Sequence, residues 1–174
     1  MKSSFDGAFN HVMQSEGGYN NDPLDPGGET NLGVTKKAWA AYLGRAIQDG
    51  EMAALTQSAV KPFYKSQYWD KIRGDDLPKG IDYIVFDFAI NAGVRQAILF
   101  LQRCVGATAD GVIGPATMTK IAQSNMRMVI LGFTNQKELF YRDIAQRKPS
   151  QERFLKGWLV RASTTEAKAM TMLA

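Results

Sequence analysis

The sequence predicts an all-α protein whose helices are interrupted once, by a long irregular loop after the first helix. Apolar residues recur three and four positions apart in nearly every segment, which is the spacing of one helix face. Residues 19–33 are the exception, because they are rich in Asn, Asp, Pro and Gly and leave room for a small hairpin at most. With 45% hydrophobic and 22% charged residues, the composition is typical of a globular protein.

The first helix is expected at the N-terminus and the loop directly after it. Its apolar face consists of Phe5, Ala8, Phe9, Val12 and Met13. The pair Gly17-Gly18 should end this helix one residue beyond Glu16, because glycine is common where helices stop. The loop of residues 19–33 is long for a compact domain, and such loops tend to carry function.

Helices account for the rest of the chain. They are predicted at residues 36–43, 55–72, 81–93, 94–106, 115–122, 125–147 and 150–172. Thr35 and Gly44 cap the first of these, and Pro62 lies in the first turns of the next helix or at a kink. Pro115 fits the first position of its helix. No flexible linker separates domains, so we expect a lobe of residues 1–93 and a lobe of residues 94–174, packed as one body.

The composition excludes several classes of chemistry. A catalytic zinc site usually takes three protein ligands, most of them His or Cys, and the chain has one histidine, His11, and one cysteine, Cys104. Cys104 lies in an amphipathic helical segment, where a cysteine is usually a small buried hydrophobic residue. We therefore expect neither a metal nor another cofactor. The N-terminus also lacks the apolar segment of a signal peptide, so export would need another route.

The net charge of +4 is concentrated at the C-terminal end, because basic and acidic residues cancel over residues 1–136. A basic tail suggests an anionic partner, although a solvated helix face explains it equally well. Within the tail, the amphipathic segment at residues 153–162 could press on anionic outer-membrane lipid. The alternative is that Phe154, Trp158 and Leu159 pack on the core. No nucleic-acid-binding motif accompanies the charge, and we expect no nucleic-acid partner.

Glu16 has the position of a general acid. The end of a helix carries partial negative charge, which disfavours a second negative charge there. An apolar neighbourhood would raise the pKa of this carboxyl group in the same direction. A glutamic acid that keeps its proton near neutral pH can protonate a departing glycosidic oxygen.

Glycoside cleavage usually needs a second carboxylate, and the loop offers Asp22, Asp25 and Glu29. Asp25 is the favoured one, with Thr30 holding the water that Asp25 would activate. The alternative is that Asp22 and Asp25, each followed by proline, only initiate turns; this is the favoured interpretation for Asp22.

Aromatic and amide side chains are typical of sugar-binding clefts. Candidates of these types are Tyr19, Asn31, Trp39, Tyr42, Tyr64, Tyr68, Trp69 and Asn91. Most aromatic residues at helical spacing belong to a core, so Trp39, Tyr42 and Tyr64 rank lower. We predict substrate contacts for Tyr19, Asn31, Tyr68, Trp69 and Asn91.

The segment from Glu16 to Thr35 resembles glycoside hydrolase family 108, the N-acetylmuramidases of phage endolysins and some bacterial proteins. The shared motifs are EGGY at 16–19, DPGG at 25–28, Thr30 and GVT at 33–35, followed by YW at 68–69, LP at 77–78, FD at 86–87 and NAG at 91–93. The segment LQRCVGATADGVIGPATM is similar to the peptidoglycan-binding region usually joined to this family.

The resemblance implies a lysozyme-like fold, with a catalytic muramidase lobe at residues 1–93 and a peptidoglycan-binding lobe at residues 94–174. It also implies cleavage between N-acetylmuramic acid and N-acetylglucosamine, with Glu16 catalytic. Related phage lysozymes place Glu, Asp and Thr as E-x8-D-x5-T, whereas here the threonine comes one position earlier and Asn31 takes its place. The segment DGVIGPAT has a second interpretation, a helix-capping loop that touches no ligand.

The leading hypothesis is a phage endolysin that acts as a monomer on glycan strands. It would stay in the host cytoplasm until a holin releases it to the cell wall. A lytic transglycosylase, which leaves 1,6-anhydro ends, is the nearest alternative. The third hypothesis is a non-catalytic protein with the same fold, which binds the cell wall or assists secretion.

Overall fold

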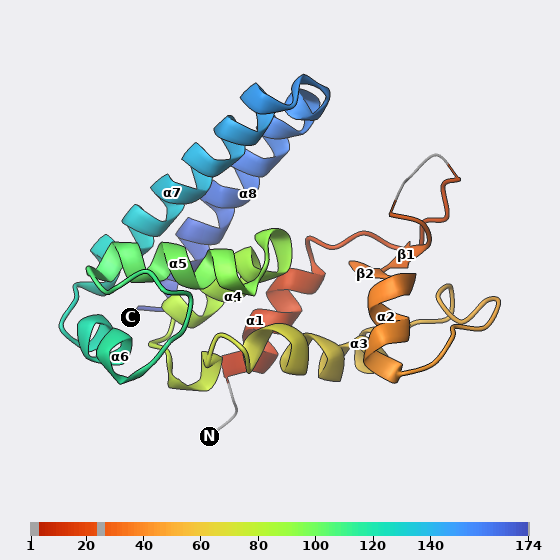
Figure 1. Cartoon of the computed structure of the whole chain (residues 1–174), viewed down its shortest axis with the longest axis horizontal. Helices are drawn as coiled ribbons and strands as arrows, with labels where there is room; N and C mark the ends of the chain where they lie inside the picture. Colours follow the sequence, from red (N-terminus) through yellow and green to blue (C-terminus); the bar gives the residue numbers. More distant parts are fainter. Residues whose placement is uncertain (1–3, 24–26, 174) are drawn as a thin grey trace. The chain divides into compact units, whose positions relative to one another are not determined.

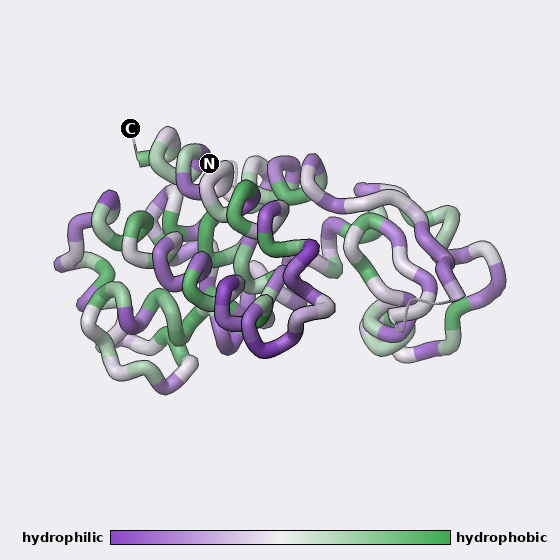
Figure 2. The backbone as a smooth tube through the Cα atoms, turned by 90° about the horizontal axis from the view of Figure 1, so that it is seen from above, coloured by the Kyte–Doolittle hydropathy of each residue, from purple (hydrophilic) through white to green (hydrophobic). Residues whose placement is uncertain are grey.

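The computed structural model describes residues 4–23 and 27–173, and the described chain is mainly helical. The elements in chain order are α1 (Ser4–Met13), β1 (Thr30–Asn31), β2 (Val34–Thr35), α2 (Lys36–Leu43), α3 (Gln57–Tyr64), a π-helical turn (Lys65–Trp69), a 3-10 turn (Gly74–Asp76), α4 (Ile81–Ala92), α5 (Val94–Val105), α6 (Pro115–Ala122), α7 (Met126–Arg147), a 3-10 turn (Pro149–Gln151) and α8 (Glu152–Thr171) (Figure 1). The predicted all-α class with a small hairpin after the first helix is confirmed. Hydrophobic and hydrophilic residues alternate along the helical turns, as Figure 2 shows, which is the pattern of amphipathic helices.

The chain forms two compact units, residues 1–67 and 68–174. The division into lobes at residues 93 and 94 stays a prediction. In the described part of the chain, no helix combines the length and the apolar character that crossing a membrane requires.

The first unit holds α1, the hairpin, α2 and α3. Phe9 of α1 packs on Tyr64 of α3 with ring centroids 5.7 Å apart, and Trp39 of α2 packs on Phe63 at 5.9 Å. Thr35 caps α2 as predicted, because its Oγ1 accepts a hydrogen bond from the amide of Ala38 at 3.1 Å. These ring contacts and the cap fix the three helices around the short hairpin.

Two helix ends in this unit differ from the prediction. Helix α1 ends at Met13, before Glu16, since the amide of Ser15 turns back to the carbonyl of Val12 at 2.9 Å. Gly17 and Gly18 do not have the left-handed conformation that ends many helices. The helix predicted at residues 55–72 begins at Gln57 behind its Thr56 cap and becomes a π-helical turn at Lys65.

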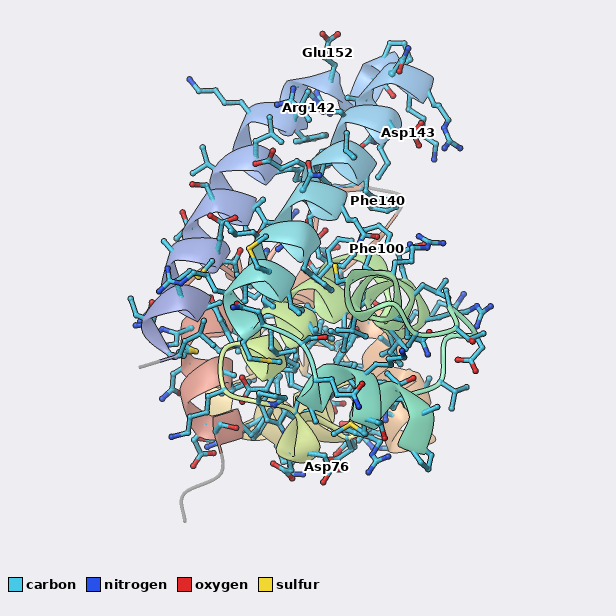
Figure 3. The ribbon with its side chains drawn as sticks, turned by 90° about the vertical axis from the view of Figure 1, so that its left-hand side faces the viewer. Asp76, Phe100, Phe140, Arg142, Asp143 and Glu152 are labelled. Atoms are coloured by element: carbon cyan, nitrogen blue, oxygen red, sulfur yellow. The ribbon has the colours of Figure 1, made fainter. Side chains whose placement is uncertain are left out.

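The second unit is built around α4. Every residue of α4 from Ile81 to Ala89 is buried, so this helix needs cover from its neighbours on all sides. Helices α5, α7 and α8 supply that cover, and α7 and α8 lie side by side as a long hairpin (Figure 1). Phe100 of α5 and Phe140 of α7, both labelled in Figure 3, hold their ring centroids 5.8 Å apart.

A charged cluster lies inside this second unit. Asp87 of α4 accepts hydrogen bonds from Lys137 of α7 at 3.3 Å and from Nη2 of Arg161 of α8 at 2.9 Å. Burial lowers the pKa of Lys137, although the neighbouring Asp87 carboxylate opposes the shift. One carboxylate therefore connects three helices.

Candidate functional site

Glu16 follows α1 and lies against the hairpin of the first unit. Its side chain is half-buried, whereas Gly33 at the tip of the hairpin is exposed. A Cβ atom placed on Gly33 would lie 2.6 Å from Oε2 of Glu16 and 2.9 Å from its carboxyl carbon. The carboxyl group therefore rests directly on the backbone of Gly33, next to solvent.

The hairpin tip is a tight turn of two residues. Strands β1 and β2 pair Asn31 with Val34, and Leu32 and Gly33 between them have φ angles of 51° and 77°. Two positive φ angles in succession characterise a type I′ turn. The left-handed conformation is ordinary for Gly33 and uncommon for Leu32, which carries a side chain.

The hydroxyl group of Tyr64 reaches the same turn from α3. It donates a hydrogen bond to the carbonyl oxygen of Leu32 at 2.8 Å, and it lies 2.5 Å from the position of a Cβ atom on Gly33. Tyr64 itself is completely buried. The buried phenol and the Glu16 carboxyl group thus converge on one side of Gly33. The sequence placed Tyr64 among the core aromatics, and nothing in its helical spacing signals this second contact.

A second polar cluster consists of Tyr19, Glu29 and Lys36, which come after Glu16 in the sequence. The hydroxyl of Tyr19 donates to Oε1 of Glu29 at 2.9 Å, and Nζ of Lys36 donates to Oε2 at 2.9 Å. These two donors, Lys36 above all, hold the pKa of Glu29 below its ordinary value. Glu29 is thereby kept as a carboxylate, while 46% of the surface of Tyr19 stays exposed. The Tyr19 ring is available to stack on a sugar.

The remaining predicted residues of the first unit have different surroundings. Thr30 lies in β1, where its backbone pairs with that of Asn20 through two hydrogen bonds of 2.8 Å. Asn31 is buried and donates to the carbonyl of Met52 at 2.8 Å, so its amide holds a neighbouring turn. Asp25 lies outside the described residues.

The other predicted sugar-binding residues belong to the second unit. Trp69 has no exposed surface; its indole donates to Oδ1 of Asp75 at 3.0 Å, and its ring meets Phe86 edge to face. It therefore packs in the core and offers a ligand no face in this structure. Tyr68 is half-buried, and Asn91 is exposed in the last turn of α4.

The DGVIGPAT segment is organised by one buried amide. Gln102 of α5 is fully buried, and its Nε2 lies within hydrogen-bonding distance of Asp110 Oδ1, of the Val112 carbonyl and of Thr117 Oγ1, at 2.8, 2.9 and 3.1 Å. Its Oε1 accepts from the amide of Gly111 at 2.9 Å. These contacts favour the interpretation as a loop that begins α6.

Cys104 is half-buried, burial raises the pKa of its thiol, and its Sγ accepts from Gln136 at 2.9 Å, which fits the predicted structural role. Within residues 4–23 and 27–173, no group of three or more His, Cys, Asp or Glu side chains is placed to hold a metal ion.

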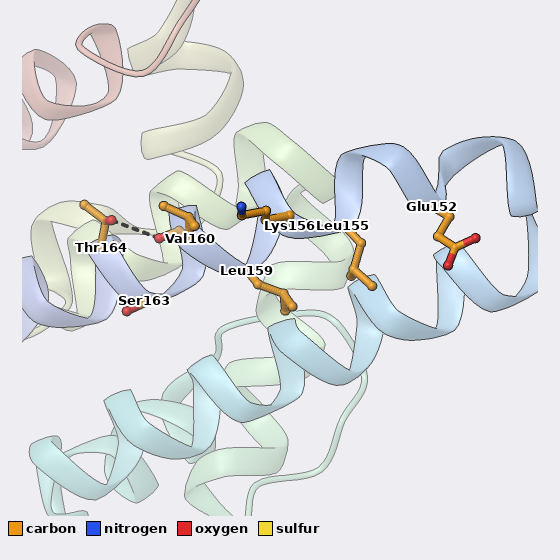
Figure 4. A pocket seen from close by; sticks show the side chains of 7 residues that line it. All are labelled: Glu152, Leu155, Lys156, Leu159, Val160, Ser163 and Thr164. Carbon is orange, nitrogen blue, oxygen red and sulfur yellow. Dashed lines mark hydrogen bonds between the residues drawn. The ribbon is translucent and has the colours of Figure 1, made fainter.

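A surface groove of about 590 Å³ runs along α8 (Figure 4). Its lining is Glu152, Leu155, Lys156, Leu159, Val160, Ser163 and Thr164, which includes none of the predicted catalytic or sugar-binding residues.

Comparisons with known proteins agree on the kind of protein. Residues 9–93 match the family model described as glycosyl hydrolase 108, and residues 96–163 match a predicted peptidoglycan domain. Among solved structures, Brucella abortus SagA is similar, with 35% identity over 99% of this chain and 97% of that chain and a TM-score of 0.87. No protein with a curated description matches the chain.

Proposed function

Because the chain belongs to the glycosyl hydrolase 108 family and is a glycoside hydrolase of peptidoglycan with a lysozyme-like fold, we propose that Glu16 is its general acid. The bond cleaved joins N-acetylmuramic acid to N-acetylglucosamine. The observation that supports this proposal is the placement of the Glu16 carboxyl group, half-buried against an exposed turn and next to a buried tyrosine hydroxyl. Partial burial favours the protonated form of a carboxyl group, and exposure on one side lets a glycan reach it.

The reaction needs a proton donor and an activated water molecule. Glu16 would donate its proton to the glycosidic oxygen as the bond to the anomeric carbon breaks. A water held by Thr30 would add its oxygen to that carbon and give its proton to the Asp25 carboxylate. Tyr19 would stack on a sugar ring with its exposed face, and Tyr68 and Asn91 would bind further sugars.

Peptidoglycan is the partner that the second matched domain indicates. We propose further that the protein acts as a monomer, and that a holin releases it from the host cytoplasm to the cell wall. Contact of α8 with anionic outer-membrane lipid would then help it act on the wall.

Replacement of Glu16 by glutamine tests the central claim. The amide keeps the size of the side chain but has no acidic proton, so hydrolysis of purified sacculi should fall by roughly 10²-fold or more. The melting temperature should change little. Glu138→Gln, a half-buried glutamate of α7, is the matched control and should keep full activity.

The products distinguish the related activities. Mass spectrometry of digested sacculi should find reducing N-acetylmuramic acid ends. Products with 1,6-anhydro ends would instead identify a lytic transglycosylase, and full activity of Glu16→Gln would refute the role of Glu16. A folded protein that binds sacculi and releases nothing would identify a non-catalytic wall-binding protein.

A further inference from the structure

We propose that Tyr64 is a positioning residue: its hydroxyl group fixes the Leu32–Gly33 turn on which the Glu16 carboxyl group rests. The inference depends on the proposed role of Glu16, because a position matters only if the carboxyl group reacts. It extends that proposal to a buried residue of α3, far from Glu16 in the sequence.

The Leu32–Gly33 turn has an uncommon conformation. Leu32 has a φ angle of 51°, in the left-handed region that side-chain-bearing residues rarely adopt. Such a conformation persists only where its surroundings hold it. The hydrogen bond of 2.8 Å from the Tyr64 hydroxyl to the Leu32 carbonyl is a contact of this kind. It ties the strained residue to a helix.

The ring of Tyr64 is held in place by the core. Tyr64 is fully buried, and its ring packs on Phe9 at 5.7 Å and on Phe63 at 5.6 Å between centroids. These contacts come from α1 and α3, so the ring position is set by the core of the first unit. The hydroxyl group is therefore in place before any substrate binds.

The side chains of Tyr64 and Glu16 both approach Gly33. The Tyr64 oxygen and Oε2 of Glu16 lie 2.5 and 2.6 Å from the same Cβ position. A shift of the turn would therefore move the backbone on which the Glu16 carboxyl group rests.

Tyr64→Phe in the full chain tests the inference, since it removes the hydroxyl group and keeps the ring. With soluble glycan fragments as substrate, kcat should fall on the order of tenfold, because small misplacements of a catalytic group are costly. KM should stay within about twofold, because Tyr64 is buried and would not touch the glycan. Tyr42→Phe is the matched control: its ring lies 5.3 Å from that of Phe63 in the same cluster, and its loss of a hydroxyl should leave kcat unchanged.

Unchanged kcat in Tyr64→Phe, with Glu16→Gln inactive, would overturn this inference and leave the proposed function standing. Full activity of Glu16→Gln would overturn the proposed function itself. If Tyr64→Phe does not fold, kcat is compared between Leu32→Asn and Leu32→Asn/Tyr64→Phe, since Asn-Gly is a preferred type I′ pair that stabilises the turn. A lower kcat in the double variant supports the role of Tyr64, and equal values overturn it.

Discussion

The carboxyl group of Glu16, the hydroxyl group of Tyr64 and the α-carbon of Gly33 share one small volume in the first unit. Glycine has two uses at this position, since it accepts a φ angle of 77° and it has no Cβ atom to displace the two oxygens. The site at the residue scale thus depends on a missing side chain as much as on those present.

Gly33→Ala should reduce activity by at least about tenfold, because the added methyl group must push the Glu16 carboxyl group or the Tyr64 hydroxyl group away. Alanine in the left-handed conformation should also cost roughly 1–2 kcal/mol of stability. Hydrolysis of sacculi and thermal unfolding measure the two effects.

Gly44→Ala provides the control, since Gly44 has a φ angle of 67° and no atom within 4 Å of its Cβ position. It should lose similar stability and keep its activity. Equal activity losses in the two variants would show that backbone strain alone is responsible.

The sequence predicts part of this site. The motifs include both Glu16 and Gly33, because the two residues lie in one continuous segment of the family pattern. They do not predict that the Tyr64 hydroxyl reaches the same turn as Glu16, since this arrangement depends on how α3 packs beside the hairpin. Residue type alone suggested Asn31 and Trp69 for a sugar cleft, and it does not show that Asn31 also holds a turn or that Trp69 packs in a core.

At the scale of elements, the connection of α4, α7 and α8 through Asp87 is the feature with the clearest energetic consequence. Asp87 and Lys137 are almost completely buried, and Arg161 closes the cluster from α8. Two cations then share one carboxylate, so removing that carboxylate would leave Lys137 without its anionic partner in a medium that solvates it poorly.

Asp87→Asn should therefore lower the free energy of unfolding by about 3–5 kcal/mol, measured by chemical denaturation. The matched control is Asp6→Asn, which removes an ion pair of 2.9 Å between exposed side chains of Asp6 and Lys61. That change should cost less than about 1 kcal/mol. Equal effects of the two substitutions would contradict a clamping role for Asp87.

Helical periodicity predicted the elements themselves well, and the discrepancies have local causes. Helices α7 and α8 lie within two residues of their expected bounds because long amphipathic patterns leave few alternatives. Helix α1 ends early, since the backbone after Val12 turns back on itself. The π-helical turn after Tyr64 could not be predicted, because apolar periodicity does not distinguish one helix type from another.

At the scale of the whole molecule, positive and negative charges are unevenly distributed along the chain. Residues 137–174 carry the entire excess of positive charge, and α8 shows apolar groups among these cations. Trp158 stacks on Tyr141 of α7 with centroids 5.3 Å apart, so this side chain packs on the protein. Phe154 is 43% exposed with the Arg153 guanidinium 4.7 Å above its ring, and Val160 is 58% exposed. Exposed apolar and basic side chains on one helix suit an anionic lipid surface.

The full chain should accordingly bind vesicles that contain phosphatidylglycerol and not vesicles of phosphatidylcholine alone, with binding that weakens as salt is added. Phe154→Ser/Val160→Ser should reduce this binding severalfold in a cosedimentation assay, because it removes the apolar contribution and keeps the charge. Met128→Ser, which changes a side chain of α7 that is 63% exposed, should bind as the parent does. Equal binding to both kinds of vesicle, or no effect of the double substitution, would assign the basic residues of α8 to solvation alone.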